Sequence, residues 1–464
     1  MHIFFHFILL ESLCFINYFY FILFNQYSNS LLHYLKTNLL ECGPILLKLS
    51  QWTISKIELQ YPDYKSNLEP FKDFYENCKT HPLDYTMTIY KDEYKSNLLD
   101  DYRLLHEHDI KSGSIAQVHI AICTKTNKKV AIKCIHPYNN NIFIYSILFF
   151  RFTMYIFECL FNYNFFCCEI SDLIYWIKQQ INLQNEYENL SMFYNIYKDN
   201  KYIVIPKPIS YSKNILIMSY EEGESVNTID LPIYKKNKLL LLLVAFIKNN
   251  LYINRISHCD LHLGNWKIQK HQDYNAICIY DFGLCSINCS KKVCNYLDNW
   301  VLKDYKKLTT FNSDNIISKK KLNKQNVFND LYTIATASNG NFDIYISKLL
   351  KYHANHNYII NIEKINIFIS LILLQNTFKD YGVLAANTCT TDFYFSDTNC
   401  LISLCETLDT MPELKQYLEN LYPELRKHFL QDVLRFAVNQ EYVSENLNLK
   451  PIDEIAIFPP VSGG

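Results

Sequence analysis

Two acidic residues and an asparagine stand at a spacing that suits magnesium and phosphate chemistry. Asp260 is followed five positions later by Asn265, and an apolar run then leads to Asp281-Phe282-Gly283. Mg²⁺ prefers oxygen ligands in octahedral geometry and usually takes only one or two of them from the protein. The pattern therefore predicts Asn265 and Asp281 as metal ligands on neighbouring loops, with a nucleotide triphosphate supplying further oxygens. Asp260 is the candidate base that positions a hydroxyl group or a water molecule.

A lysine further upstream predicts a second contact to the same phosphates. Residues 104–136 alternate apolar and polar side chains on both sides of a TKTNKK turn, which indicates strand, strand, turn and strand. Lys133 falls on the third strand, where a kinase-type site places an ammonium group against the α- and β-phosphates. The loop before it holds one glycine, Gly113, where kinases usually have three. Its small neighbours Ser114 and Ala116 are predicted to let phosphates approach the backbone.

A helix is needed to hold this lysine in place. Residues 171–194 have helical spacing, and Ser171 or Asp172 is the expected N-cap. Glu186 is predicted to pair with Lys133 and to hold it toward the phosphates. Glu188 is the nearest alternative partner, and an ordinary solvated helix face is the other.

The adenine end of a nucleotide needs a backbone edge. Residues 214–225 indicate a strand that leads into a hinge. The backbone around Met218 and Tyr220 is predicted to hydrogen-bond the adenine edge. Side chains there carry little information, since the contact would be made by the main chain.

The bulk composition describes a folded chain with no bias toward nucleic acid. Of the 464 residues, 49% are hydrophobic and 20% are charged, and 45 basic residues stand against 46 acidic ones. The length allows two or three domains with a sizeable core. A net charge close to zero gives no electrostatic footprint for nucleic acid as a partner.

Cysteine spacing argues against a zinc ribbon and against a thioredoxin-type redox motif, because none of the sixteen cysteines forms a C-x-x-C pair. A metal cage remains an alternative, since six possible ligands lie near the two aspartates: His258, Cys259, His262, Cys285, Cys289 and Cys294. We favour the phosphate site, which accounts for the same stretch. A large chain without signs of secretion suggests reduced thiols.

Two apolar segments bear on membranes. Residues 1–24 are long enough to cross a bilayer core of about 30 Å, and they contain neither Lys nor Arg. We expect a membrane anchor there, with a helix packed on the folded body, or a stretch outside the folded protein, as alternatives; no transit peptide is readable. Residues 140–168 are interrupted by Arg151 and Glu158 and lie between parts of one site. We therefore expect a buried or membrane-facing helix, not a span.

The remaining chain is predicted to be mainly helical. Apolar periodicity runs through residues 327–352, 360–378 and 414–436. The lysine run at 318–323 indicates a solvated loop, and residues 451–464 are expected to be irregular. Near the other end, residues 41–56 indicate a helix on which Lys48 and Gln51 share a face.

Taken in order, these motifs resemble the UbiB (aarF-domain) family of atypical kinase-like proteins. The stretches that carry the resemblance are GPILLKLSQW, SGSIAQVHIA, VAIKCIHP, QQINLQNEYENL, ILIMSYEEG, HCDLHLGNW and YDFGL. The Q-V-H and D-L-H-x-G-N motifs are more specific to that family than to ordinary protein kinases. The resemblance covers roughly residues 40–290 and is strongest to the eukaryotic, mitochondrial branch of coenzyme Q-related proteins.

The resemblance implies an α+β, atypical protein-kinase-like bilobal fold with an N-terminal helical extension over the active site and a mostly helical C-lobe. It also implies ATP and Mg²⁺ as cofactors, phosphoryl transfer or ATP hydrolysis, and a membrane lipid or lipid-like substrate. Support of ubiquinone biosynthesis or of lipid homeostasis, proteins of ubiquinone biosynthesis as partners, and a membrane-associated, mitochondrial location are implied as well. The expected segments are 1–30 (apolar), 31–100 (extension), 101–225 (N-lobe with inserted helices), 226–450 (C-lobe) and 451–464 (tail).

Family motifs of the extension are partly altered here. A K-x-G-Q motif enters the site in that family; Lys48 and Gln51 match it and are therefore predicted site residues, while Ser50 replaces its glycine. The companion E-x-D motif maps onto Gln180-Ile181-Asn182, so both acids are amides. The usual proline of the catalytic loop is Leu263.

Two rival functions stay open. A nucleotide-binding pseudokinase that serves as a scaffold for membrane-bound biosynthetic enzymes would account for the altered glycine loop and for the amides in place of E-x-D. A conventional protein kinase is disfavoured, because no A-P-E-type motif and no evident activation loop follow Leu284.

Overall fold

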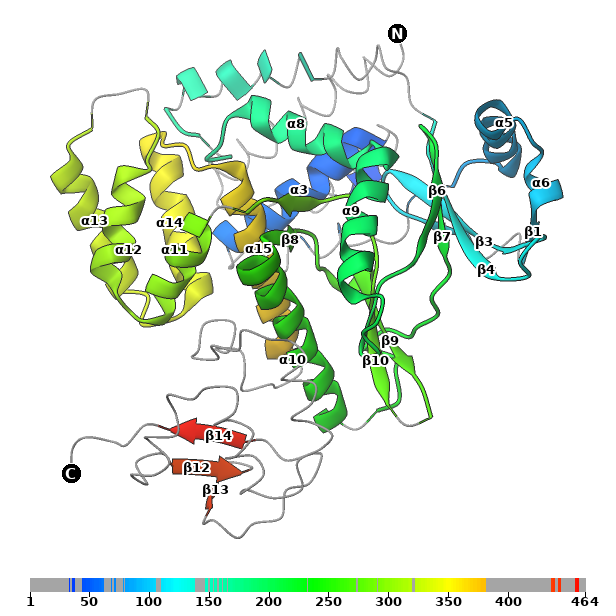
Figure 1. Cartoon of the computed structure of the whole chain (residues 1–464). Coiled ribbons are helices and arrows are strands. Elements are labelled where there is room, and N and C mark those ends of the chain that lie inside the picture. The colour runs from blue at the N-terminus through cyan, green and yellow to red at the C-terminus, as the bar shows by residue number, and fades with distance from the viewer. Residues whose placement is uncertain are drawn as a thin grey trace. The chain divides into compact units, whose positions relative to one another are not determined.

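The computed structural model describes most of the chain between residues 44 and 380 and three short strands beyond it (Figure 1). The described residues are 44–61, 80–105, 110–137, 166–231, 233–272, 274–289, 291–318, 322–380, 435–438, 441–443 and 455–458, with scattered residues among 33–78 and 147–164. The chain divides into two units, one made of residues 1–229 and 254–392 and the other of residues 230–253 and 393–464.

The first unit contains an antiparallel sheet of six strands, which come from residues 102–219. Its order is β1-β3-β4-β7-β6, with β2 paired to β3. The strands are β1 (Tyr102–Leu104), β2 (Lys111–Ser112), β3 (Ala116–Cys123), β4 (Lys129–Ile135), β6 (Pro208–Tyr211) and β7 (Ile215–Ser219). The sequence correctly predicted β2, β3, β4 and β7, and Lys133 lies on β4 as expected.

The alternation along β4 gives the two faces of this sheet different chemistry. Ile132 and Cys134 are fully buried in an apolar core that α5 (Leu83–Tyr94) and α6 (Leu98–Asp101) close from one side. Because successive side chains of a strand point to opposite faces, Lys133 projects from the other side. The apolar face therefore fixes the direction of the lysine.

Helix α9 (Leu183–Tyr197) packs behind the second face, against β6 and β7. The preceding helix, α8 (Ile170–Gln180), packs against α9 and against the helix over residues 44–60. The predicted cap was wrong: Glu169 is the N-cap of α8, so Ser171 and Asp172 lie inside its first turn. Asn182 interrupts the helical stretch because its side chain accepts a hydrogen bond from the Gln184 amide and begins α9.

The second half of this unit combines short strand pairs with helices. The strands are β5 (Ile203–Val204), β8 (Ile256–His258), β9 (Trp266–Lys270), β10 (Asn275–Ile279) and β11 (Cys285–Ile287). β10 lies between β5 and β9, and β8 pairs with β11. The helices, which Figure 1 shows gathered as a group except for α15, are α11 (Lys291–Val301), α12 (Tyr305–Asp314), α13 (Lys324–Thr336), α14 (Phe342–His356) and α15 (Ile362–Asp380).

The helix predicted over 327–352 is two helices, α13 and α14. Asn339 and Gly340 between them have φ angles of 48° and 78°. Backbone in this left-handed region ends a helix, and Gly and Asn adopt it most readily. The helix predicted over 360–378 corresponds to α15.

Helix α3 (Pro44–Gln60) carries the motif of the extension and is anchored to the C-lobe helices. The Trp52 indole donates a hydrogen bond to the Asn366 amide oxygen over 2.9 Å. The Ser347 hydroxyl donates to the Gln60 carbonyl over 3.0 Å. These two hydrogen bonds join α3 to α15 and to α14. The helices of this unit therefore determine where the face of α3 that carries Lys48 lies.

The second unit contains α10 (Ile233–Asn249), a π-helical turn (Asn250–Asn254) and a three-stranded antiparallel sheet of order β13-β12-β14. The strands are β12 (Arg435–Val438), β13 (Glu441–Val443) and β14 (Ile455–Phe458). The tail after residue 450 was expected to be irregular, which is wrong for β14: its four residues, all apolar, pair with β12. Most of the helix predicted over 414–436 lies outside the described residues, and its last two residues already belong to β12.

The predicted membrane segments are described only in part. Residues 1–24 and the lysines of the 318–323 run lie outside the described residues. The described parts of residues 147–160 are helical, and Leu148, Phe152, Tyr155 and Leu160 are more than half exposed. These four side chains contradict a buried helix, and the membrane-facing alternative stays a prediction. Within the described ranges, no helix has the length and apolarity needed to cross a bilayer.

Candidate nucleotide site

The site is built around Lys133, whose ammonium group lies between two carboxylates. Its Nζ is 2.6 Å and 2.8 Å from the two carboxylate oxygens of Glu186 on α9, and 3.4 Å from Oδ1 of Asp281. Burial by itself lowers the pKa of Lys133, but the two carboxylates outweigh it, and the net pKa is raised. Glu186 is therefore the partner, as predicted. The rival Glu188 is exposed and hydrogen-bonded to Gln184.

Asp281 is held in a backbone conformation that suits an aspartate at a turn. Its φ is 54°, in the left-handed region that Asn and Asp tolerate better than most residues. Its Oδ1 accepts a hydrogen bond from the Gly283 amide over 3.2 Å, and a Cβ at Gly283 would lie 3.1 Å from the same oxygen. Partial burial raises its pKa, but Lys133 and Lys48 outweigh that effect and keep the pKa below the usual range. Asp281 is thus a charged carboxylate at the predicted metal position.

Asp260 is paired with a residue of the extension. Nζ of Lys48 on α3 lies 2.9 Å from Oδ2 of Asp260, and the two side chains are 12% and 16% exposed. Burial opposes ionisation of Asp260, but Lys48 and then His262 lower its pKa. Burial likewise opposes the charge of Lys48, whose pKa is nevertheless raised by Asp260 and Asp281. The prediction that Lys48 enters the site is consistent with this geometry.

The other predicted residue of α3 reaches the phosphate loop. The Ser114 hydroxyl donates a hydrogen bond to Oε1 of Gln51 over 3.1 Å, and both residues are buried. Lys48 and Gln51 therefore contact opposite sides of the site, the catalytic loop and the small-residue loop. One helix face spans both, which is what the three-residue spacing predicts.

A buried histidine joins the two loops that carry the acidic residues. The Asp260 amide donates to Nδ1 of His258 over 3.2 Å, and Nε2 of His258 lies 3.1 Å from the Tyr280 carbonyl. Since Nδ1 accepts, the ring proton is on Nε2 and is donated to Tyr280. Burial lowers the pKa of His258, which keeps the ring neutral. His258 therefore fixes Asp260 relative to the segment that leads from β10 to Asp281.

Three further histidines support the phosphate loop from behind. Nε2 of His136 lies 3.0 Å from the Gly113 carbonyl, and its Nδ1 lies 2.9 Å from Nδ1 of His81. The Thr86 hydroxyl lies 2.9 Å from Nε2 of His81 and 3.2 Å from Nε2 of His119. Burial lowers the pKa of all three rings, that of His81 to about 4. The loop at Gly113 is held by a neutral hydrogen-bonded chain.

Asn265 completes the set of oxygen donors. It lies at the end of a 3-10 turn (Leu263–Asn265), and its side-chain nitrogen donates to the Asp260 carbonyl over 2.8 Å, which leaves the amide oxygen as the possible ligand atom. Among the described residues, no three His, Cys, Asp or Glu side chains gather into a metal cage, so the cysteine and histidine alternative is not supported there. One amide and one carboxylate oxygen fit Mg²⁺ that also binds phosphates.

The predicted hinge residues lie at the end of β7. Met218 pairs with Ala131 on β4, the Ser219 amide donates to the Lys207 carbonyl, and the Tyr220 amide donates to the Lys129 carbonyl. The amides of residues 219 and 220 are thus engaged inside the sheet. The adenine contact at Met218 and Tyr220 stays a prediction.

Sequence reasoning missed the supporting residues more than the charged ones. His81, His136 and His258 fix the loops, and Phe282 packs on Phe193 of α9 at 4.9 Å between ring centroids. His119 of the Q-V-H motif and His136 of VAIKCIH were visible as members of their motifs. The only sign of a supporting role was a polar residue within an apolar pattern.

The family comparison decides the identity of this arrangement. The model of the ABC1 atypical kinase-like domain matches residues 74–311, which is more than half of the chain. The chain belongs to the ABC1 atypical kinase-like family. ABC1 and UbiB are names for one family, so the resemblance of the sequence motifs is confirmed, as is the kinase-like α+β fold.

Curated ABC1 relatives are distant. The Dictyostelium discoideum protein "Probable serine/threonine-protein kinase abkC" is 26% identical over 249 residues, which cover 50% of this chain and 34% of that protein. "ABC1 family protein MCP2" of Saccharomyces cerevisiae is 25% identical, with coverages of 54% and 46%. "ABC1 family protein C21C3.03, mitochondrial" of Schizosaccharomyces pombe is 24% identical, with coverages of 50% and 38%. The chain spans less than half of the length of each of these relatives.

Among solved structures, the Mycobacterium tuberculosis Rv3197–erythromycin complex matches with a TM-score of 0.43 at 14% identity, covering 62% of this chain and 73% of that one. The Rio2 kinase of Chaetomium thermophilum in its ADP/Mg²⁺-phosphoaspartate complex matches with a TM-score of 0.30 at 13% identity, covering 58% and 76%.

A second family model matches outside the ABC1 domain. The ThiS family model matches residues 401–464. The "Molybdopterin synthase sulfur carrier subunit" of Dictyostelium discoideum is 47% identical over 49 residues, which are 10% of this chain and 55% of that protein. The matched residues overlap the end of the predicted C-lobe (226–450) and the whole predicted tail (451–464). The boundaries of the lobes stay predictions.

Glu186→Gln is expected to change how stability depends on pH. Burial raises the folded-state pKa of Glu186 from 4.5 to about 6. A carboxyl group whose pKa is raised by folding stabilises the folded state fully at pH values below its unfolded-state pKa. This stabilisation is lost as the pH rises through its folded-state pKa. One pKa unit corresponds to about 1.4 kcal/mol, so wild type should lose about 2 kcal/mol relative to the variant between these two pH values. Urea unfolding across this window measures the difference.

Glu188→Gln is the matched control, because Glu188 is exposed on the same helix. Its unfolding profile should follow wild type. A constant difference between wild type and Glu186→Gln over the whole window would show that Glu186 ionises as an exposed glutamate does.

Proposed function

We propose that this ABC1 domain binds ATP with Mg²⁺ and transfers or hydrolyses its terminal phosphoryl group. The observation that carries the proposal is the position of Lys133 between Glu186 and Asp281, together with the side-chain oxygen of Asn265, for which the described residues provide no hydrogen-bond donor. A lysine held by a helix glutamate next to a metal-binding aspartate is the arrangement by which kinases hold the phosphates of ATP.

Each residue then has a defined task. Lys133, steadied by Glu186, would bind the α- and β-phosphates, and Asn265 and Asp281 would hold the metal. A bound Mg²⁺ would neutralise charge on the β- and γ-phosphate oxygens. Asp260 would orient a hydroxyl group or a water molecule for in-line attack. Catalysis of this kind depends on positioning and on charge neutralisation, and forms no covalent bond to the protein.

A small or lipid-like substrate is favoured over a protein substrate. β11 ends at Ile287 and pairs with β8, and α11 begins at Lys291. This short connection provides no room for the activation segment by which protein kinases bind peptides. A membrane lipid or a ubiquinone precursor as substrate, proteins of ubiquinone biosynthesis as partners, and a membrane-associated, mitochondrial location are part of this proposal. One relative carries "mitochondrial" in its name.

The extension is proposed to control access to Asp260. While Lys48 is 2.9 Å from the Asp260 carboxylate, that oxygen is occupied by an ammonium group, and a substrate hydroxyl competes with it. Turnover would therefore require that Lys48 moves. The scaffold alternative rests on the same contact, since a permanently paired Asp260 would leave a protein that binds nucleotide without turnover.

A second candidate function belongs to residues 401–464. The ThiS match and the 47% identity to a sulfur carrier subunit support a sulfur-carrier module. Sulfur can be carried as a persulfide on a thiol or as a thiocarboxylate. Residues 401–464 contain a single cysteine, Cys405. The match ends with Gly463 and Gly464.

Asp281→Asn should weaken magnesium-dependent nucleotide binding. Asn keeps the left-handed backbone acceptable while it removes the charge that the metal needs, so affinity for Mg²⁺-ATP is expected to fall about tenfold or more. Titration of a fluorescent ATP analogue, with Mg²⁺ and with EDTA, measures it. Asp92→Ala removes an exposed aspartate and should bind as wild type does. Wild-type affinity in Asp281→Asn would refute the assignment of the metal ligand.

Lys48→Met should raise ATP turnover several-fold, because Asp260 is released from its ion pair. Hydrolysis is measured with and without cardiolipin-containing liposomes and a phenolic mimic of a ubiquinone precursor. Lys48→Arg keeps a cation and should stay close to wild type, and adding Asp260→Asn should remove the gain. Nucleotide binding without turnover in every variant would instead favour the scaffold.

The sulfur-carrier proposal predicts that residues 401–464 acquire one sulfur atom when the full chain is incubated with ATP, an activating enzyme and a persulfide donor, with a thiol reductant added in the arm that tests Gly464. On Cys405 the donor's outer sulfur is transferred to the thiolate to give a persulfide, and the donor leaves as a thiol. On Gly464 adenylation releases diphosphate, the donor's outer sulfur displaces AMP, and the reductant cleaves the acyl disulfide to a thiocarboxylate, so that one oxygen is exchanged for one sulfur. Mass spectrometry of the proteolytic peptides locates the sulfur on Cys405 or on Gly464, and Cys405→Ser separates the two. Asp281→Asn should have no effect on this modification, since it alters only the nucleotide site. A peptide map without added sulfur would contradict the carrier function.

A further inference from the structure

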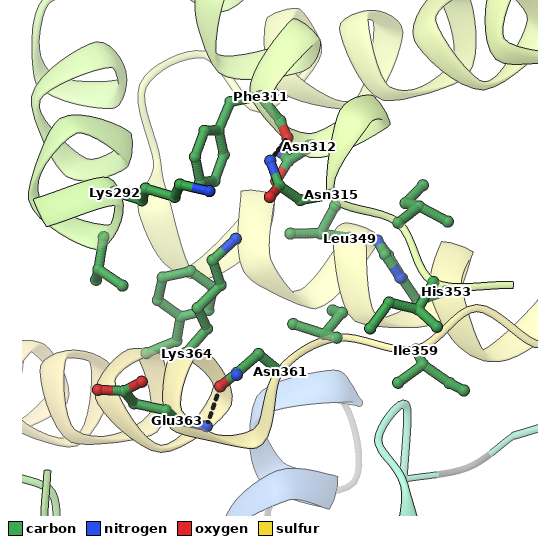
Figure 2. A pocket seen from close by; sticks show the side chains of 15 residues that line it. Lys292, Phe311, Asn312, Asn315, Leu349, His353, Ile359, Asn361, Glu363 and Lys364 are labelled. Carbon is green, nitrogen blue, oxygen red and sulfur yellow. Dashed lines mark hydrogen bonds between the residues drawn. The ribbon is translucent and has the colours of Figure 1, made fainter. Parts of the chain in front are cut away.

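A cavity of about 260 Å³ lies among the C-lobe helices, away from the residues that form the nucleotide site (Figure 2). Its walls come from α11, α12, α14 and α15 and from the connections at residues 315–317 and 359–361. None of its lining residues belongs to the catalytic loop, to the phosphate loop or to α3. The cavity is therefore a separate site, formed by other residues than the nucleotide site.

Two lysines give this cavity positive charge. Figure 2 shows the ammonium groups of Lys292 on α11 and Lys364 on α15 turned toward each other beside the ring of Phe311. Nζ of Lys364 is 4.3 Å from the centroid of that ring and 5.4 Å from the centroid of Tyr296. In the described part of the chain, no carboxylate lies within ion-pair distance of Lys364.

The neighbouring acid does not neutralise the charge of Lys364. The Glu363 carboxylate accepts a hydrogen bond from the Ser286 hydroxyl, and in Figure 2 it points away from both ammonium groups. Partial burial, together with the charge of Lys292, lowers the pKa of Lys364 to about 8. A bound anion would relieve both costs, because it supplies the charge that the surroundings of Lys364 lack.

A buried histidine supplies a further polar contact. His353 of α14 lines the cavity, is 4% exposed, and has no hydrogen-bond partner for its Nδ1 among the described residues. Burial lowers its pKa to about 3, so the ring is neutral. A buried ring nitrogen without a partner costs free energy, and a ligand oxygen placed beside it would recover that cost.

The rest of the wall is apolar. The aliphatic and aromatic lining residues are Val293, Phe311, Ile316, Ile317, Leu349, Ile359, Ile360 and Phe368. Three asparagines, Asn312, Asn315 and Asn361, are the remaining polar members. A ligand that fits these walls must carry a short hydrocarbon or aromatic body in addition to its charged group.

We propose that this cavity binds a small organic anion whose phosphate or carboxylate head lies between Lys292 and Lys364 and whose apolar body packs against the Phe311, Leu349 and Phe368 side of the wall. A ligand that carries a second oxygen at the far end of its apolar body would also accept a hydrogen bond from His353 Nδ1. The head group belongs either to a soluble metabolite or to a lipid, and the two share the same chemistry. The site is independent of the proposed nucleotide site.

The test uses the full chain saturated with a non-hydrolysable ATP analogue, so that the nucleotide site cannot take up the probe. The probes are hexyl phosphate, hexanoate and the uncharged hexanol, titrated by calorimetry. Hexyl phosphate or hexanoate should bind, and hexanol should bind at least about tenfold more weakly, because it lacks the charge that the lysines recognise.

Lys364→Gln and Lys292→Gln should each weaken binding of the acidic probe about fivefold or more. Both side chains reach solvent, so neither change is expected to prevent folding, and thermal unfolding checks this. The matched control is Lys306→Gln, an exposed lysine on α12 that does not line the cavity; it should bind as wild type does. Vesicles containing phosphatidic acid form a separate arm, in which a loss of vesicle binding in Lys364→Gln identifies a lipid head group.

The proposal is overturned if wild type binds none of the acidic probes or the vesicles, if hexanol binds as tightly as hexyl phosphate, or if the two cavity variants bind as Lys306→Gln does. Retained binding of soluble probes without vesicle binding supports the proposal and assigns a soluble anion.

Discussion

The contact between Lys133, Glu186 and Asp281 is the interaction on which the rest of the structure depends. A buried ammonium group is tolerated only with opposite charge close by, and here the two carboxylates come from α9 and from the end of β10. The apolar face of β4 sets the direction of the lysine, and α9 sets the glutamate. The Asn189 amide of α9 also donates to the Phe282 carbonyl, so the same helix holds the segment after the aspartate.

The extension adds a second layer to this charge cluster. Lys48 brings a second cation to Asp260 and Asp281, and its helix is fastened to α14 and α15 instead of to the sheet. A movement of α3 would change the charge of the site and the hydrogen bond to Ser114 together. Local electrostatics and the position of one helix are therefore coupled in this protein.

Charged site residues were predictable from the sequence because their types and order reflect chemistry that few other sites need. Lys133 was placed correctly on a strand, Glu186 on a helix and Asp281 after a strand. The cap of α8, the break between α13 and α14 and the strand at 455–458 were not, since each depends on a turn or on a pairing partner distant in the sequence. The histidines behind Gly113 were missed because their role depends on burial, which spacing does not reveal.

The break at Asn339 and Gly340 illustrates how this chain, which contains only nine glycines, forms its left-handed turns. In the described residues, a positive φ occurs at ten non-glycine positions, five of them asparagines, and at one glycine. Asparagine therefore fills several turns in this chain that glycine fills in many proteins. Among the described residues, left-handed backbone falls on asparagine more often than on glycine. A search for such turns by glycine alone would miss most of those in this chain.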